Sequence, residues 1–273
     1  MKSFHRRSSR PAPKPVPAIP VVVVRHDGLR ADQLLVERGL APSRTVAQRL
    51  IEAGCVSWAA GPINKASAVL PESAELTVAE GDSDRYASRG GIKLAGALSH
   101  TGIAVRGRIC LDVGQSTGGF TDCLLQAGAE SVVGIDVGHG QLHRRLRDDP
   151  RVTCIEGVNA RAIDQQRLSH AHFDLIVADL SFISLTLVLP QLPPLLANNG
   201  DMLLLVKPQF EVGPENVGKG GIVRNAVLYP QVEAKLREAA IAAGLRVLDY
   251  FDSPIAGTDG NREFFIWISH ERH

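Results

Sequence analysis

Four charged residues stand where a packed sheet would not hold them without a function. Asp179 follows the apolar stretch FDLIVAD, and Lys207 ends the stretch DMLLLVK. Lys93 lies in SRGGIKL, before the first strand pattern, and Glu263 opens EFFIWI. Because the carboxyl ends of parallel strands meet at one edge of a sheet, we expect Asp179 and Lys207 to lie close together there. Each residue alone is typical of a solvated surface, but the combination indicates a site for proton transfer.

A glycine-rich loop follows the first strand pattern, in the stretch LDVGQSTGGFTDCL at residues 111–124. No Gly-Lys-Ser/Thr ends this loop, so it is not a P-loop, and its glycines lack the GxGxxG spacing of dinucleotide-binding loops. The acid-x-Gly order resembles the loop that holds the amino-acid end of S-adenosylmethionine in methyltransferases. Asp136, in VVGIDVG, follows the next strand pattern, where an acidic residue binds ribose hydroxyls in related folds. A plain glycine-rich turn is the alternative, and the placement of Asp136 disfavours it.

An α/β domain is needed to position these residues. Strand patterns recur at 108–112, 131–136, 151–155, 173–178, 201–206, 246–251 and 263–269, with helical segments between them. Such alternation favours a Rossmann-like domain with a mostly parallel, seven-stranded sheet covered on both faces. The last strand pattern follows its predecessor without a helix between them, which predicts antiparallel pairing of the last strand.

A small α+β unit is expected before this domain. LRADQLLVERG and PSRTVAQRLIEAG both have helical apolar spacing, with Ser43 as the N-cap of the second helix. Gly39 is expected to end the first helix and Gly54 the second. Short extended stretches follow at 55–58 and 75–78. The polar stretch EGDSDRYASRG then marks a boundary. We therefore predict domains at 28–81 and 90–270, joined by a linker at 82–89.

Residues 1–27 are expected to form a basic, proline-rich, disordered tail. The first twenty residues contain five Lys or Arg, five prolines and no acid, and this composition cannot bury a core. Arg and Ser without acids are also typical of an organelle transit peptide, but the prolines spoil an amphipathic helix.

The composition of the whole chain of 273 residues excludes several classes of protein. The net charge of +1 does not indicate a nucleic-acid binder by itself. The four cysteines form no CxxC pair, which favours a reducing compartment and disfavours a disulfide framework or zinc site. The apolar run VVVV is far too short to cross a membrane. We expect a cytoplasmic monomer that binds neither a membrane nor a metal.

Taken together, the motifs closely resemble the TlyA family. They are SRGGIKL, LDVGQSTGGFT, GIDVGHGQL, ADLSFISL, VKPQFEVG with GKGGIVRN, and NREFFIW, in the expected order within residues 28–270. This family comprises ribosomal-RNA ribose methyltransferases, often labelled hemolysins. The catalytic half also resembles the FtsJ/RrmJ type of RNA 2′-O-methyltransferase, and the front unit resembles a small RNA-binding domain named after a ribosomal small-subunit protein. The resemblance implies S-adenosylmethionine as cofactor and a cytidine of ribosomal RNA, in ribosomal subunits, as substrate.

The resemblance also implies roles for the four charged residues. Lys93, Asp179, Lys207 and Glu263 match the family's Lys-Asp-Lys-Glu tetrad. A ribose hydroxyl is a poor nucleophile at neutral pH, so catalysis consists of removing its proton and aligning it with the methyl group. We expect Lys207 to be the general base, and Lys93 to lower the pKa of Lys207 and stabilise the developing alkoxide. The two carboxylates would orient the two ammonium groups, and no metal is required.

The remaining site residues are assigned in the same way. The cofactor residues are expected to be Asp112, Gly114, Ser116, Thr117, Gly118, Gly119, Phe120, Asp136 and Asn159. The RNA-binding residues are expected to be Arg30, Arg44, Arg49 and Lys65. Because residues 25–81 carry six Lys or Arg and seven Asp or Glu, RNA contact there must come from local placement and not from a broadly basic surface.

Several stretches depart from the family pattern or have two readings. Gln115 replaces a small residue in the cofactor loop, RYAS stands where some members have a Trp-Val pair, and VSWAAGP lacks the usual strand ending.

In HGQLHRRLR, two histidines lie four apart without the Glu of a zinc-protease motif, and the arginines either contact RNA or cover a helix. The glycine-rich segment PQFEVGPENVGKGGIVRN, directly after Lys207, is expected to be a lid that orders the substrate.

Three other functions compete with ribose methylation. An RNA-binding protein with a decayed enzyme domain is disfavoured by the intact tetrad. A pore-forming hemolysin is disfavoured because no strongly amphipathic lytic helix is found. An NAD-dependent oxidoreductase is disfavoured by the glycine spacing. The chain stops shortly after the last strand pattern, which resembles the shorter branch of the family that acts on the large subunit alone.

Overall fold

The computed structural model describes residues 28–41, 43–52, 56–78, 85–257 and 259–270. The predicted basic tail and the first residues of the predicted linker lie outside the described residues. The chain divides into two compact units, with the boundary between Thr77 and Val78. Within the described residues, no helix is both long and apolar enough to cross a membrane.

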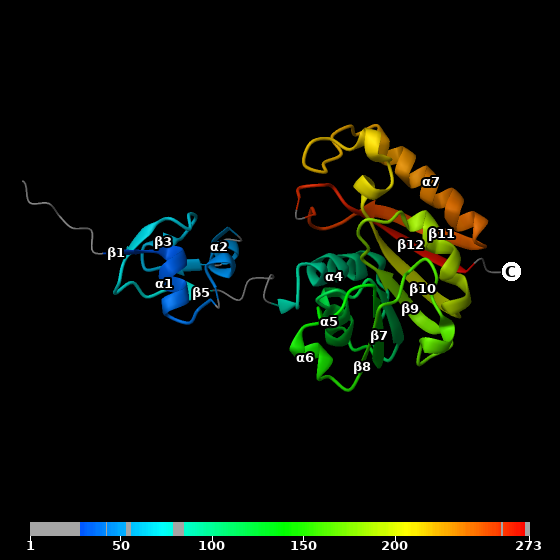
Figure 1. Cartoon of the computed structure of the whole chain (residues 1–273), viewed down its shortest axis with the longest axis horizontal. Coiled ribbons are helices and arrows are strands. Elements are labelled where there is room, and N and C mark those ends of the chain that lie inside the picture. Colours follow the sequence, from blue (N-terminus) through cyan, green and yellow to red (C-terminus); the bar gives the residue numbers. More distant parts are fainter. Residues whose placement is uncertain (1–27, 42, 53–55, 79–84, 258, 271–273) are drawn as a thin grey trace, which may run out of the picture. The chain divides into compact units, whose positions relative to one another are not determined.

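The first unit combines two helices with two small sheets (Figure 1). The two helices and the strands near 55–58 and 75–78 were predicted, and the remaining three strands were not. Strand β1 (Gly28–Arg30) pairs antiparallel with β4 (Val69–Pro71), and β2 (Val56–Trp58) lies between β3 (Gly61–Pro62) and β5 (Thr77–Val78). Helices α1 (Ala31–Glu37) and α2 (Arg44–Glu52) bury their apolar faces in the core of this unit. The predicted N-cap of α2 is confirmed, because Ser43 Oγ accepts a hydrogen bond from the N–H of Val46 at 3.3 Å.

The second unit is built on a seven-stranded sheet with the order β11-β12-β10-β9-β6-β7-β8. Its strands are β6 (Ile109–Val113), β7 (Ser131–Asp136), β8 (Val152–Glu156), β9 (Phe173–Ala178), β10 (Leu196–Val206), β11 (Leu245–Asp252) and β12 (Phe264–His270). Five strands that are adjacent in the sheet, in the order β10-β9-β6-β7-β8, pair in parallel. Strand β12 runs antiparallel to both of its neighbours, β10 and β11. The predicted sheet is confirmed, and only β10 begins clearly earlier than expected.

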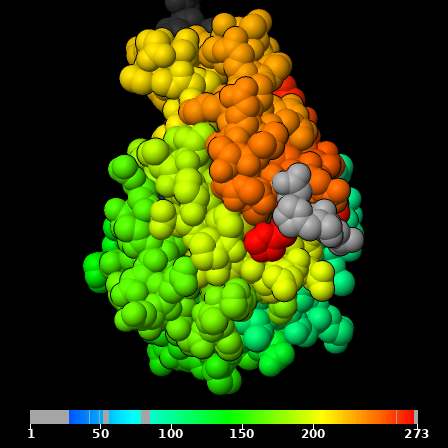
Figure 2. Space-filling model, turned by 90° about the vertical axis from the view of Figure 1, so that its right-hand side faces the viewer, coloured from blue at the N-terminus to red at the C-terminus, as the bar shows by residue number. Residues whose placement is uncertain are grey.

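Both faces of the central strands are buried, which is why β9 and the second half of β10 are continuous apolar runs. Along β10, Met202 and Leu204 belong to one core cluster, and Leu203 and Leu205 belong to the other. Helix α7 (Leu228–Ala242) covers the first face. Helices α4 (Gly90–Thr101), α5 (Gly119–Gln126) and α6 (Arg144–Arg147) cover the second. Figure 2 shows α7 in orange on the outer surface, beside the yellow-green turns that follow β9.

Two connections differ from the helical segments that the alternation predicts. Between β9 and β10 the chain forms the 3₁₀ turns η2 (Leu185–Leu187), η3 (Leu189–Gln191) and η4 (Pro193–Leu195). The stretch VLPQLPPLL contains three prolines, which have no N–H to donate and therefore stop an α-helix. Its leucines are nevertheless buried against the sheet. Between β8 and β9 the only helical turn in the described chain is η1 (Gln165–Arg167).

Candidate active site

The loop between β6 and α5 passes very close to the end of β9. Gly114 has a φ of +87°, and a Cβ at this position would lie 2.6 Å from the carbonyl oxygen of Asp179. A Cβ on Gly119, the first residue of α5, would lie 2.1 Å from Ser88 Oγ. Only glycine allows the backbone to approach its neighbours this closely. The glycines therefore bring the loop, the end of β9 and the start of α4 together at one edge of the sheet.

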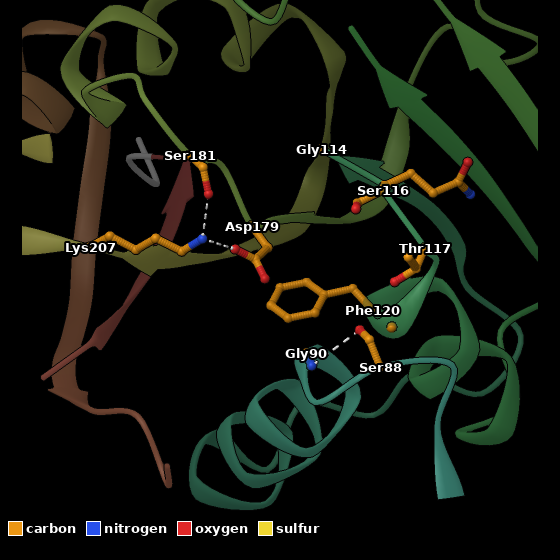
Figure 3. A pocket seen from close by; sticks show the side chains of 11 residues that line it. Ser88, Gly90, Gly114, Ser116, Thr117, Phe120, Asp179, Ser181 and Lys207 are labelled. Carbon is orange, nitrogen blue, oxygen red and sulfur yellow. Dashed lines mark hydrogen bonds and ion pairs between the residues drawn. The ribbon is translucent and has the colours of Figure 1, made fainter. Parts of the chain in front are cut away.

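A cavity of about 220 Å³ opens at this meeting point (Figure 3). It is lined by Ser88, Gly90, Gly114, Gln115, Ser116, Thr117, Gly119, Phe120, Asp179, Ser181 and Lys207. Five of the predicted cofactor residues line it, namely Gly114, Ser116, Thr117, Gly119 and Phe120. The first turn of α5 lies at its wall, so the partial positive charge of a helix N-terminus is available to a bound anion.

Asp112 lies beneath the loop and not in the cavity. Its side chain is wholly buried, and its Oδ2 accepts a hydrogen bond from Thr121 Oγ1 at 2.7 Å. Gln115 Nε2 donates to the same Thr121 oxygen at 2.9 Å. Burial raises the pKa of the Asp112 carboxyl to about 7. Gln115 thus completes a buried polar chain that joins the loop to α5.

The three other predicted cofactor residues also lie outside the lining of this cavity. Asp136 follows β7, and its carboxylate accepts hydrogen bonds from the N–H groups of Ser116, at 2.8 Å, and Gly138, at 2.7 Å. Asp136 therefore links the cofactor loop to the loop after β7. Gly118 is the N-cap of α5, with a φ of 94°. Asn159 is exposed after β8.

The predicted tetrad is assembled as two ion pairs. Lys207 Nζ lies 2.6 Å from Asp179 Oδ1 and also donates to Ser181 Oγ at 2.9 Å (Figure 3). Lys93 Nζ lies 2.5 Å from Glu263 Oε2. The side chains of Lys93 and Glu263 are 9% and 3% exposed, while that of Asp179 is 24% exposed. The Lys207 pair is therefore the one more open to a ligand, and the Lys93 pair is the more buried one.

All four tetrad residues line a second cavity, of about 370 Å³. It shares Ser88, Gly90, Asp179, Ser181 and Lys207 with the first cavity. The two cavities therefore meet at the Lys207–Asp179 pair.

Sequence reasoning missed two phenylalanines in the wall of the second cavity. Phe182 is 92% exposed and has a φ of +64°, and its ring centroid lies 5.2 Å from that of Phe210. A large apolar side chain so exposed at a positive φ indicates a ligand-facing role. Ser181, Gln209 and Asn261 were missed as well. Their positions in the sequence could have identified the two phenylalanines, because Phe182 lies in the loop that begins with Asp179 and Phe210 lies in the loop that begins with Lys207.

The glycine-rich segment after Lys207 begins with the 3₁₀ turns η5 (Pro208–Phe210) and η6 (Pro214–Asn216). Further along, the amide of Asn261 accepts from the N–H of Val223 and donates to the carbonyl of Gly221, both at 2.9 Å. Asn261 thus ties this segment to the chain before β12. The role of the segment as a substrate-ordering lid stays a prediction.

In the first unit, two of the predicted RNA-binding residues share one carboxylate. Asp32 is wholly buried and accepts hydrogen bonds from Arg30 at 3.0 and 3.1 Å, from Arg44 at 2.9 Å and from Gln48 at 3.0 Å. The hydrogen bonds from Arg30 hold the pKa of the Asp32 carboxyl well below its usual range. Lys65 is exposed. The side chain of the fourth predicted residue, Arg49, lies outside the described part of the chain.

The histidine and arginine residues around α6 make local contacts. His143 Nδ1 accepts from the N–H of Arg145 at 3.3 Å, and the Arg145 side chain pairs with Asp122. Arg144 pairs with Asp148 at 3.5 Å. These contacts favour the interpretation that the arginines cover the helix. Among the residues that the structure describes, no group of three His, Cys, Asp or Glu side chains is arranged to hold a metal ion.

Comparison with known proteins assigns a family to each of the two units. Residues 86–270 match the FtsJ-like methyltransferase family, and residues 29–69 match the S4 domain. The chain is 45% identical over 239 residues to the 16S/23S rRNA (cytidine-2′-O)-methyltransferase TlyA of Mycobacterium tuberculosis, which covers 88% of this chain and 89% of that protein. It is 38% identical over 236 residues to Hemolysin A of Brachyspira hyodysenteriae, covering 86% of this chain and 98% of that protein.

A solved structure from Streptococcus thermophilus, described as a hemolysin, has a TM-score of 0.70 and 37% sequence identity, and covers 90% of this chain and 89% of its own. The family match takes in more than half of the chain, and the similarity to the curated relatives extends over both units. The protein therefore belongs to the TlyA family of FtsJ-like methyltransferases, with an S4 domain before the methyltransferase domain.

Proposed function

We propose that the protein uses S-adenosylmethionine to methylate the 2′-hydroxyl of a cytidine in ribosomal RNA. The observation that carries this proposal is the Lys207–Asp179 pair, which lies where the two cavities meet. Group transfer requires donor and acceptor to meet at one point, with a proton acceptor beside them. The substrate is supported by the names of relatives that act on cytidines of rRNA.

The residues around the first cavity fit S-adenosylmethionine. Gly114 lets the loop lie against the carbonyl oxygen of Asp179 at the wall of the cavity, and the first turn of α5 suits the carboxylate of an amino-acid group. Asp136 keeps acceptor capacity beyond the two N–H groups it binds, because a carboxylate has about four lone-pair sites. It can therefore also bind ribose hydroxyls. When bound, the cofactor supplies a methyl group that is already activated on a sulfonium.

The chain's own residues handle the proton and the charge. Lys207 in its neutral amine form accepts the proton of the ribose 2′-hydroxyl, and Asp179 and Ser181 hold the ammonium group that forms from two directions, at 2.6 and 2.9 Å. This fixes the direction from which the proton is taken. Lys93 contributes a positive charge that stabilises the developing alkoxide, and the nearly buried Glu263 keeps Lys93 in place.

The S4 domain supplies affinity for RNA in this proposal. We assign residues 28–81 to it and residues 90–270 to the methyltransferase domain, with residues 82–89 between them. The end of that connection packs on α5, since Tyr86 is buried and the N–H of Ala87 donates to Asp122 at 2.7 Å. An enzyme of ribosomal RNA is expected in the cytoplasm, where the subunits are, and we expect it to act as a monomer.

The test is methyl transfer to ribosomal subunits purified from cells that lack this protein. Small and large subunits are incubated separately with the protein and S-adenosylmethionine, and ribose methylation is mapped by mass spectrometry. We expect new 2′-O-methylcytidine at a defined position in at least one subunit. Methylation confined to bases, or none in either subunit although the cofactor binds, would overturn the proposal.

A second function is suggested only by the hemolysin names of two of the compared proteins. Red-cell lysis by the same protein preparation tests it directly. The Lys207→Ala variant provides the control, because an activity of the methyltransferase site is lost in this variant and an independent lytic activity is not.

A further inference from the structure

The second cavity contains two side-chain amides that differ in their hydrogen bonding. Both ends of the Asn261 amide are engaged, because its oxygen accepts from the N–H of Val223 and its nitrogen donates to the carbonyl of Gly221. Gln209 lines the same cavity, but its Oε1 is buried and has no hydrogen-bond partner among the described residues. A buried acceptor without a donor is unfavourable, and a ligand that supplies the donor relieves the cost. One amide thus holds the chain together, and the other is left for a ligand.

The backbone of Gln209 is fixed on both sides. It lies in η5, where the N–H of Phe210 donates to the carbonyl of Lys207 at 3.0 Å. On its other side Glu211 is buried, and Lys235 Nζ donates to the carbonyl oxygen of Glu211 at 2.9 Å and pairs with its carboxylate at 3.2 Å. Gln209 is therefore held at a constant position relative to Lys207, the residue at which the ribose hydroxyl reacts.

We propose that Gln209 selects the target base by hydrogen-bonding the Watson–Crick edge of a cytosine that is turned out into the second cavity. This inference rests on the proposed function, because it takes a cytidine as the substrate. A nucleotide whose 2′-hydroxyl is at Lys207 has its base in the same cavity, where the rings of Phe182 and Phe210 offer a stacking surface. The phenylalanines accept any base, so discrimination has to come from a polar group.

The chemistry of the amide matches cytosine. Cytosine presents an amino donor beside a ring-nitrogen acceptor, and a glutamine amide presents an acceptor beside a donor. Oε1 of Gln209 would accept from the amino group, which satisfies its unpaired oxygen, and Nε2 would donate to the ring nitrogen. Uracil has a ring N–H and a carbonyl in the reverse order, so it pairs only with an amide turned over by about 180°, and the preference for cytosine requires the packing around the buried Oε1 to resist that turn. A bidentate pair of this kind discriminates between bases by about tenfold to hundredfold.

The experiment compares two versions of the substrate in single-turnover methyl transfer at saturating S-adenosylmethionine. Ribosomal subunits carry either the native cytidine at the mapped position or a uridine in its place. We expect the wild-type protein to prefer cytidine by about tenfold to hundredfold. Gln209→Ala should lose this preference by slowing transfer to cytidine while leaving transfer to uridine within about twofold. Gln209→Glu, whose carboxylate accepts hydrogen bonds but cannot donate one, should lose part of the preference for cytidine.

The control is Gln165→Ala, which removes an exposed amide from η1 and should leave both rates unchanged. Cofactor affinity, measured by calorimetry, shows whether each variant is folded, and Gln209→Asn replaces Gln209→Ala if the latter fails this check. Equal slowing of both substrates by the Gln209 variants, or no cytidine preference in the wild-type protein, would overturn the inference. Failure of the wild-type protein to methylate native subunits is a different result and refutes the proposed function itself.

Discussion

The two units of the protein differ in how many basic side chains pair with each carboxylate. In the S4 unit one buried acid, Asp32, binds Arg30 and Arg44, whose side chains remain 40% and 52% exposed. In the methyltransferase unit each lysine of the tetrad has its own carboxylate, and the four side chains are at most 24% exposed. Two exposed arginines on one acid leave a positive charge at the surface, which suits contact with phosphate. The balanced, enclosed tetrad suits proton transfer, so we expect binding from the first unit and chemistry from the second.

The largest effect should come from Lys207, on the chemical side of this comparison. Lys207→Ala removes the proton acceptor and should lower the rate of methyl transfer by about 10²–10⁴-fold. Lys207→Arg keeps a positive charge beside Asp179 but cannot release its proton, so it should be nearly as slow. S-adenosylmethionine affinity should change little in either variant. A rate within about tenfold of the wild type in single-turnover assays would exclude general-base catalysis by Lys207.

Removing the S4 unit should separate the two tasks. A shortened chain that begins at Asp84 keeps the tetrad and the cofactor loop, so it should fold and bind S-adenosylmethionine normally. It should not methylate ribosomal subunits, because the target nucleotide is no longer presented to the cavity. Calorimetry with the cofactor and methyl transfer to subunits measure the two properties. Near-normal transfer would show that the methyltransferase domain recognises its RNA alone.

Cofactor binding should depend on Asp136. Asp136→Ala removes the oxygens that bind the N–H groups of Ser116 and Gly138 and would bind the ribose, so cofactor affinity should fall by about tenfold or more. Asp136→Asn keeps one acceptor oxygen and should have a smaller effect. RNA affinity without the cofactor should remain as in the wild type. Unchanged cofactor affinity in a calorimetric titration would show that the adenosine group binds elsewhere.

The sequence predicted those parts of the fold and site that depend on local pattern. Parallel strands buried on both faces are apolar runs, so their polar end residues, Asp179 and Lys207, were recognisable. The pairing of Lys207 with Asp179, and of Lys93 with Glu263, depends on the spatial order of the strands, which periodicity does not encode. The prolines between β9 and β10 did carry a local signal against an α-helix. Asp32 carried none, because a single acid in the first turn of a helix is most often solvated.

The two wholly buried carboxylates should respond oppositely to pH. The pKa of Asp112 is raised by burial from 3.8 to about 7, so the folded protein keeps a proton that the unfolded chain releases. Its stabilising contribution is complete below the unfolded pKa and is lost as pH rises through about 7, by at most about 1.4 kcal/mol per pH unit. The pKa of Asp32 is lowered, so its contribution is present above the unfolded pKa and is lost at acidic pH.

Two amide variants test this contrast through urea unfolding at a series of pH values. Asp112→Asn keeps an oxygen for Thr121 and should flatten the decline of the unfolding free energy between about pH 4 and pH 7. Asp32→Asn should instead weaken the S4 unit at neutral pH and remove its acid sensitivity. If Asp112→Asn leaves the slope between pH 4 and pH 7 unaltered, Asp112 is ionised throughout that range.

The smallest effect should come from Arg44, on the binding side of the comparison. Its side chain is half exposed and shares Asp32 with Arg30, so Arg44→Gln removes one positive charge while Arg30 still satisfies the buried acid. RNA affinity should fall only a few-fold, and the slope of log affinity against log salt should decrease by about one. The double variant with Arg49→Gln should lower both quantities further. Arg237→Gln removes a partly exposed arginine that pairs with Glu233 on α7, and serves as the matched control in the other unit. If Arg44→Gln weakens RNA binding without changing the salt slope, Arg44 makes no phosphate contact, and its role is to hold Asp32 and α2 in place.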